Sequence, residues 1–224
     1  YGTLPESYDS RKLGLITPVR NQNPWGTCWA FGALSAGEAS LIKKGLADTS
    51  VDLSELHLSY FFFNSPTDPL RNTAKDTVSL PTTASNYLES GGNNLFTMFE
   101  LASWTGAAPE ALAPYENSSS IPSLNSALAY EDTAHLQNAR FVSTADLDSV
   151  KKLIMEYGAV SSAFYYDSRY LSDSSGYYYP RVASYNNHIV TLVGWDDNYA
   201  AYHFKEGSRP SSPGAWIAKN SHGT

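Results

Sequence analysis

The strongest constraint on the fold is a change in hydrophobic pattern along the chain. The first half has helical patterns at residues 28–44, 54–62 and 95–104, and a fourth lies within residues 145–158. After it come β-branched and aromatic runs bounded by Gly, Pro and Asn, namely AVSSAFYY, GYYYP, HIVTLVGW and GAWIAKN. Helices and strands segregated in this way indicate the α+β class, with two lobes that face each other.

The helix boundaries carry their own signals. Thr27 is the expected N-cap of the first helix and Gly45 its stop. Ser54 begins the second helix, and Gly158 ends the fourth. The stretch 64–80 is polar and irregular.

The segments between these patterns suggest where the lobes divide. Residues 107–135 are rich in Pro, Ser and Ala and look like a long connection between the lobes. We expect a mainly helical lobe at residues 1–125, whose extended N-terminal segment can cross to the other lobe. We expect a β-rich lobe at residues 126–224 that is truncated at its C-terminus.

Composition excludes several classes of protein. A chain of 224 residues with 42% hydrophobic and 17% charged residues can bury a substantial core without metals or disulfides. A formal net charge of -7 gives no indication of nucleic-acid binding. The apolar runs are too short to span a bilayer, so no membrane-spanning segment is expected. One cysteine allows no internal disulfide.

The single cysteine, Cys28, has two interpretations. It can be a small buried hydrophobic residue in the stretch NQNPWGTCWAF. It also stands at the expected start of a helix, where unpaired N–H groups favour a thiolate, the nucleophilic form of cysteine. A nucleophile of this kind also needs a histidine as its base.

Among five histidines, His188 has the best position for that base, because it begins the apolar run HIVTLVGW. Asn220, at the end of another apolar run, can accept a hydrogen bond from the imidazole and fix its orientation. The side-chain amide of Gln22, six residues before Cys28, can stabilise an oxyanion beside the Cys28 backbone N–H.

Four stretches together resemble the papain-like cysteine proteases. They are TPVRNQNPWGTCWAFGALSAGEA, LSELHL, NNHIVTLVGWDDN and GAWIAKNSHGT, and LPESYDSRKLG resembles the family's mature N-terminus. The resemblance implies a papain-like two-lobed fold, with a helical left lobe, a β-rich right lobe and the active-site cleft between them. It implies a cysteine endopeptidase that forms a thioester acyl-enzyme, with Cys28 as nucleophile and His188 as base.

The same resemblance implies the remaining site residues. Asn220 orients the histidine and Gln22 lies in the oxyanion hole. Gly91 and Gly92, within SGGN, resemble the paired glycines that bind the substrate backbone. Asn93, Ala163 and Asn187 are the other residues expected to bind substrate.

The sequence departs from the family at several positions. Trp25 stands where a cysteine is usual, in agreement with the single-cysteine count. His222 stands where a tryptophan usually covers the Asn–His hydrogen bond, and an imidazole shields that bond less well; the alternative is a simple surface residue. The interval from His188 to Asn220 is longer than usual, and the family normally continues beyond residue 224.

The resemblance is greatest to a secreted or cell-surface bacterial branch of the family, so we expect that location. Expected partners are a peptide or protein substrate, a propeptide of the precursor and further domains. No cofactor is expected, and no metal: Asp196 and Asp197 are interpreted as solvated turn carboxylates. Two other functions stay open, a catalytically silent homologue that binds peptides or cell-surface ligands, and a cysteine amidase.

Overall fold

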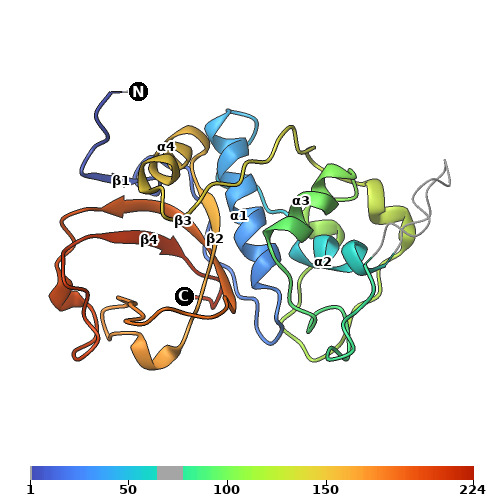
Figure 1. The fold of residues 1–224 in the computed structure, drawn as a ribbon. Helices are drawn as coiled ribbons and strands as arrows, with labels where there is room; N and C mark the ends of the chain where they lie inside the picture. The colour runs from blue at the N-terminus through green and yellow to red at the C-terminus, as the bar shows by residue number, and fades with distance from the viewer. Residues whose placement is uncertain (1, 65–77) are drawn as a thin grey trace.

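The computed structural model describes residues 2–64 and 78–224, so most of the stretch predicted to be polar and irregular lies outside the described residues. Helix α1 (Cys28–Lys43) runs through the centre of the molecule. A β-sheet and α4 (Leu147–Tyr157) lie on one side of it, and α2 (Glu55–Phe63) and α3 (Asn94–Ala102) lie on the other (Figure 1). The predicted segregation of helices and strands into two lobes is confirmed.

The sheet is antiparallel and is built around β3 (His188–Asp196). β4 (Ala215–Lys219) pairs along one edge of β3. The other edge is shared by β2 (Val160–Phe164) and the short β1 (Ser7–Asp9). The N-terminal segment therefore crosses the molecule to join the sheet of the β-rich lobe.

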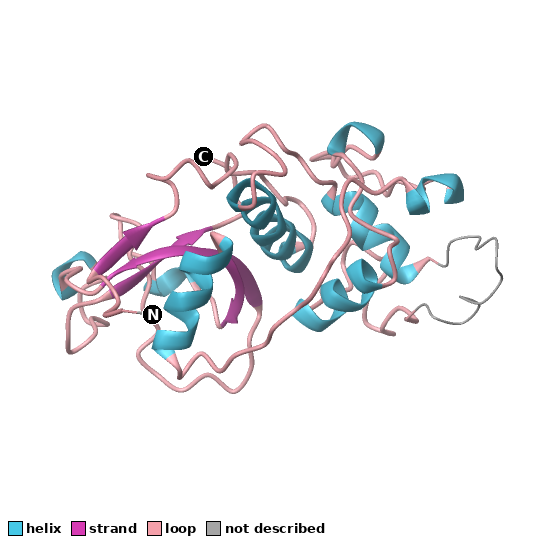
Figure 2. Cartoon of the chain, turned by 90° about the horizontal axis from the view of Figure 1, so that it is seen from above, coloured by secondary structure: helices cyan, strands magenta, loops and turns pink. Residues whose placement is uncertain are grey.

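Four short 3-10 helices complete the described elements: η1 (Glu110–Leu112), η2 (Ser126–Tyr130), η3 (Ser168–Tyr170) and η4 (Ala201–His203). Viewed from above, the sheet lies at one end and the short helices of the helical lobe at the other (Figure 2). In the described parts of the chain, no helix has the length and apolar character needed to cross a membrane.

The helix boundaries follow the sequence signals closely. Gly45 has φ +69° just after α1, and Gly158 has φ +92° just after α4. Ser54 caps α2 by accepting a hydrogen bond from the backbone N–H of His57. The predicted strand GYYYP was wrong: that run contributes only an isolated bridge between Leu171 and Tyr177.

Each lobe has its own core. In the helical lobe, Trp29, Leu58 and Phe62 pack together, and Ile189 of β3 joins them from the other lobe. In the β-rich lobe, Ile154 of α4 packs on Trp195 and its neighbours in the sheet. The division of the chain at residue 125 stays a prediction. Just beyond it, Leu128 accepts a hydrogen bond from His57 and Thr133 donates one to Ala107, both residues of the helical half.

Candidate active site

Cys28 is the first residue of α1, as the sequence predicted. Thr27 occupies the N-cap position as predicted, and its side chain makes no cap hydrogen bond. Its hydroxyl lies instead 2.7 Å from the hydroxyl of Tyr115. Backbone N–H groups at the helix start consequently remain available to the thiol, and those of Cys28 and Trp29 act to lower its pKa.

The two lobes touch directly beside the thiol. Gly32, one turn along α1, packs so closely on β3 that an added Cβ would lie 2.6 Å from a methyl carbon of Ile189. The hydroxyl of Thr191 donates to the Gly32 carbonyl at 2.9 Å, which fixes the helix on the strand. The backbone N–H of Ile189 acts to lower the pKa of the Cys28 thiol, and Cys28 packs against the cluster that contains Ile189. The thiol therefore lies beside the residue that follows His188.

His188 is the first residue of β3 and is buried. Its Nε2 lies 2.7 Å from Oδ1 of Asn220, which directly follows β4. The backbone N–H of Ser221 donates to the same oxygen at 2.9 Å. Because an amide oxygen only accepts, Nε2 must carry the proton, which leaves Nδ1 as the basic nitrogen. The structure thus brings His188 and Asn220 together as expected.

Aromatic rings surround the imidazole of His188. Phe164 and Tyr166, at the end of β2, lie with their ring centres 5.8 and 5.5 Å away. His222 stacks on it with centres 5.1 Å apart and an interplanar angle of 25°. His222 is solvent-exposed, yet it covers His188 rather than being a surface residue without contacts at the site.

Gln22 is buried, and both ends of its amide are engaged. Nε2 donates to the Trp25 carbonyl at 2.9 Å, and Oε1 accepts from the Ser221 hydroxyl at 2.7 Å. An amide nitrogen has two N–H groups, so one remains for a ligand. Gln22 also donates from its backbone to Ser221, which joins this segment to the strand end that holds Asn220.

Sequence reasoning missed two residues that support this arrangement. Ser221 fixes the Gln22 amide, but nothing in a serine next to Asn220 indicates that role. Tyr115, in the stretch interpreted as a connection between lobes, donates its hydroxyl to the Gln22 carbonyl at 2.6 Å. Its ring also packs edge-on against Phe31 of α1, so it supports the start of the helix.

Burial is the main electrostatic influence on the pair. It raises the pKa of the Cys28 thiol, although the three backbone N–H groups act to lower it. It lowers the pKa of His188, which the Asn220 hydrogen bond acts to raise and the proximity of His222 lowers further. Taken one at a time, both groups favour their neutral forms, which opposes the thiolate expected from the helix start.

The paired glycines lie against the helical lobe. Gly91 has φ +65°, in the left-handed region that favours glycine. A Cβ added at Gly92 would lie 2.6 Å from Cγ of Trp29, a fully buried ring. Asn93 uses its side chain to cap α3, accepting from the N–H groups of Leu95 and Phe96.

Two further predicted residues lie on the β-rich side. Ala163 pairs with Ile189 in the β2–β3 ladder, within the cluster that Cys28 contacts. The side chain of Asn187 is occupied, because it donates to the Tyr166 carbonyl at 2.9 Å and accepts from its N–H at 2.6 Å. That Gly91, Gly92, Asn93, Ala163 and Asn187 bind substrate stays a prediction.

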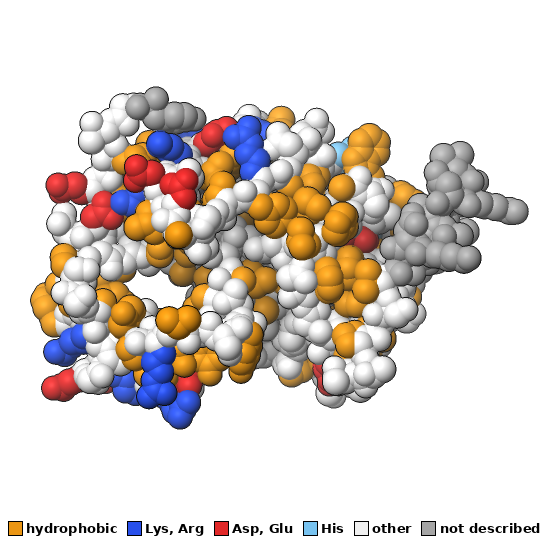
Figure 3. All heavy atoms as spheres, viewed as in Figure 1, with side chains coloured by type: hydrophobic (Ala, Val, Ile, Leu, Met, Phe, Trp, Pro, Cys, Tyr) orange, Lys and Arg blue, Asp and Glu red, His pale blue; other side chains and the backbone are white. Residues whose placement is uncertain are grey.

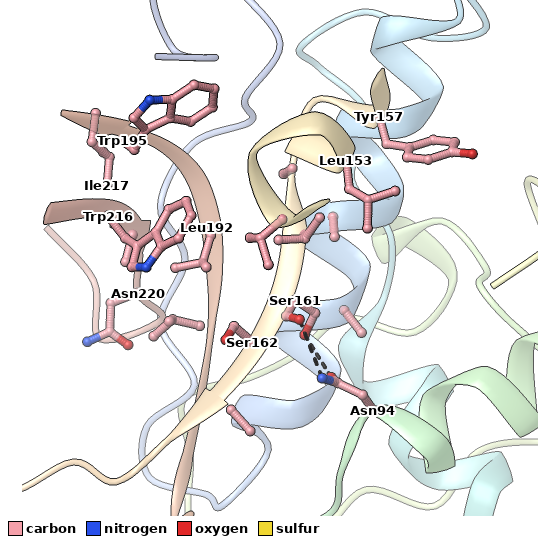
Figure 4. A pocket seen from close by; sticks show the side chains of 18 of the residues that line it. Asn94, Leu153, Tyr157, Ser161, Ser162, Leu192, Trp195, Trp216, Ile217 and Asn220 are labelled. Atoms are coloured by element: carbon pink, nitrogen blue, oxygen red, sulfur yellow. Dashed lines mark hydrogen bonds between the residues drawn. The ribbon is translucent and has the colours of Figure 1, made fainter. Parts of the chain in front are cut away.

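The lobes also meet at Asn94, which lies next to the paired glycines at the start of α3 (Figure 4). The Ser161 hydroxyl of β2 donates to its Oδ1 at 2.7 Å. This bond ties the segment that follows the paired glycines to the β-rich lobe.

A large hollow opens in the β-rich lobe (Figure 3). A cavity of about 2430 Å³ extends over the sheet, where Leu192, Trp216 and Ala218 line it, and it also reaches Leu34 of α1 and Met98 of α3. Its lining reaches Asn220 and His222 but contains neither Cys28 nor His188. The candidate chemistry therefore lies at the edge of the hollow.

The carboxylates weighed as cation ligands have protein partners. Both oxygens of Asp197 accept from Lys151 at 2.7 Å, and Asp196 accepts from the backbone of Asn198. Within residues 2–64 and 78–224, no three His, Cys, Asp or Glu side chains come together in a way that would hold a metal ion.

Comparisons with known proteins identify the family of the chain. The family model described as papain family cysteine protease matches residues 4–60 and 75–224. The senescence-specific cysteine protease SAG12 of Arabidopsis thaliana is 29% identical over 232 residues, covering 100% of this chain and 54% of that protein. Mouse cathepsin K is 51% identical over 43 residues, which are 19% of this chain and 13% of that protein.

Solved structures extend the similarity to the whole fold. The clostridial cysteine protease Cwp84 after propeptide cleavage superposes with a TM-score of 0.74 at 30% identity, over 97% of this chain and 50% of that one. Cwp84 of Clostridium difficile, solved with its lectin-like domain and described as surface layer associated, gives 0.75 at 29% identity, over 100% and 46%. The chain thus spans about half the length of these relatives. With its helical lobe, its β-rich lobe and a family match along nearly the whole sequence, this chain belongs to the papain family of cysteine proteases.

Proposed function

We propose that the chain is a cysteine endopeptidase, which hydrolyses peptide bonds through a thioester on Cys28. Two observations carry the proposal: the hydrogen-bonded His188–Asn220 pair, and a thiol at a helix start that packs against the cluster containing Ile189, the residue after His188. Family membership supports it, because the matched model covers both halves of the site.

The residues divide the reaction between them. Cys28 Sγ attacks the carbonyl carbon of the scissile bond while its proton passes to Nδ1 of His188. The oxyanion binds the free Nε2–H of Gln22 and the backbone N–H of Cys28. His188 then gives the proton to the departing amine, which leaves a thioester. Water attacks the thioester with His188 as base, so that the acid product leaves and the thiol is restored.

Burial disfavours a thiolate on Cys28 or an imidazolium on His188 when either forms alone. We expect the two charges to form together, as an ion pair. Transfer of the proton from Cys28 to His188 creates a thiolate and an imidazolium at the same moment, and their attraction is strong where water is excluded. The N–H groups of Cys28, Trp29 and Ile189 then solvate the anion, and Asn220 stabilises the cation.

A second candidate is a catalytically silent homologue that binds peptides or cell-surface ligands in the same cleft. The observation that favours it is the pair of pKa shifts, since both burial effects favour the neutral thiol and imidazole. A cysteine amidase would use the same residues on a non-peptide amide.

We further propose that the protein is bacterial and acts outside the cell or at its surface. The similarity to Cwp84, described as surface layer associated, supports this location.

Cleavage profiling on a peptide library tests the function, with Cys28→Ala and His188→Ala as controls. The proposal predicts cleavage by the unchanged chain and loss of cleavage in both variants, while their thermal unfolding stays that of a folded protein. Cleavage that persists in Cys28→Ala would contradict it. Binding of peptides without cleavage by the unchanged chain would favour the silent homologue.

A further inference from the structure

His222 makes a contact that a simple aromatic cover could not make. Its Nδ1 lies 3.2 Å from Nδ2 of Asn220, in addition to its stacking on His188. The other end of the Asn220 amide is fixed, because Oδ1 accepts from His188 and from the backbone of Ser221. Nδ2 is therefore the donor in this contact, and Nδ1 of His222 must carry a lone pair and no proton.

We propose that His222 is a positioning residue that makes the His188–Asn220 pair sensitive to acid. In its neutral form it accepts from Asn220 and holds the amide oxygen toward His188. When it is protonated, it has no lone pair at Nδ1 and repels the amide N–H. Rotation of the Asn220 side-chain amide by half a turn then becomes favourable. It would place Nδ2, a donor, against the Nε2–H of His188 and break the orienting hydrogen bond. This inference rests on the proposed function and deepens it.

A charged His222 would also act on His188 directly. Two stacked imidazolium rings repel each other, and the proximity of His222 already lowers the pKa of His188. Among the described residues, the titratable groups whose rings face His222 are His188 of β3 and Tyr166, which follows β2. The segment before α1 contributes the uncharged Asn21, which forms a backbone bridge to His222. No carboxylate is among these neighbours to compensate the charge.

The pH dependence of kcat/KM on a cleaved peptide tests the proposal, with two variants of His222. Gln offers an acceptor for Asn220 that cannot be protonated, and Phe keeps a stacked ring but offers neither acceptor nor charge. His222→Gln should keep activity at pH 7.5 within about threefold, and His222→Phe should lose about tenfold there, the effect expected for one hydrogen bond. In both variants the acid limb should become less steep, because the ionisation of His222 no longer contributes to it.

The control is His203→Phe, a histidine on η4 that contacts Tyr199 and Tyr202. It should leave the steepness of the acid limb unchanged. If both His222 variants lower activity equally at every pH and keep the acid limb of the unchanged protein, His222 is only a cover and the proposal is overturned.

A readout without catalysis separates this inference from the proposed function. In Cys28→Ala protein, the NMR titration of the His188 ring should shift to higher pH when His222 is also replaced by Phe. This shift would support the positioning role even if no peptide were cleaved. An unchanged His188 titration would overturn the role even if the chain proved to be an active peptidase.

Discussion

The oxyanion role of Gln22 gives the sharpest test of how the site is built. Gln22→Ala removes the Nε2 donor, and loss of one oxyanion donor costs about 10²–10³ in kcat, or about 2.7–4 kcal/mol. The structure adds a second effect, since the Trp25 carbonyl and the Ser221 hydroxyl both lose their partner. An unpaired buried polar group costs about 1–3 kcal/mol of folding free energy. We therefore expect a large fall in kcat, little change in KM, and a measurable fall in stability.

Ser221→Ala is the matched control, because it removes only the bond that orients the Gln22 amide and keeps the donor itself. It should reduce kcat by about tenfold, the value of one hydrogen bond. The assay is steady-state cleavage of one peptide at fixed pH, with thermal unfolding measured on the same preparations. If Gln22→Ala leaves kcat unchanged while lowering the unfolding temperature, Gln22 is structural and the oxyanion assignment is wrong.

Three further outcomes follow from the contacts. Gly92→Ala should destabilise the fold by about 1–3 kcal/mol in thermal or urea unfolding, because its Cβ would enter the buried Trp29 ring. Gly37→Ala, at an open position of α1, is its control and should be neutral or stabilising; equal losses would refute the packing argument. Asn220→Ala should lower kcat/KM and leave His188 without its 2.7 Å partner, which a kinetic comparison at pH 7 measures; an unchanged value would remove Asn220 from the site. Burial raises the pKa of Glu55 to about 8, so the folded state holds a proton that the unfolded state has released above its ordinary carboxyl pKa. Glu55 should therefore lower stability as pH rises from about 5 to 8, by at most about 1.4 kcal/mol per unit, and Glu55→Gln should make the measured fall less steep in urea titrations. The same slope in both proteins would show that Glu55 is not the cause.

The local elements were predictable because their signals are local. The capping and stop residues place α1 and α4 to within one or two residues, and the apolar runs at 188–195 and 214–220 correspond to β3 and β4. GYYYP has strand-forming residues, but it gains no ladder beyond one bridge, because β3 is already paired on both edges. The three-residue β1 is too short for an alternating pattern to show.

The candidate site was predictable only in part, for a physical reason. A sequence can indicate a thiol at a helix start and a histidine at a strand start. It cannot show that Gly32 lets α1 approach β3 so closely that Ile189 joins the cluster against which Cys28 packs. The supports from Tyr115 and Ser221 are long-range hydrogen bonds between residues about 90 and 200 positions apart, and no local pattern encodes them. Burial of the thiol, which opposes the helix effect, is likewise a property of the packed lobes.

The central claim is that Cys28 is activated by transfer of its proton to His188. Because Cys28 is the only cysteine in the chain, its rate of alkylation by a neutral reagent such as chloroacetamide can be followed by intact mass across pH 4–10. We predict a reactive plateau that persists at pH 6 and disappears in His188→Ala, where reactivity should rise only as an ordinary buried thiol ionises. Equal profiles in the two proteins, with no reactivity at pH 6, would contradict the account.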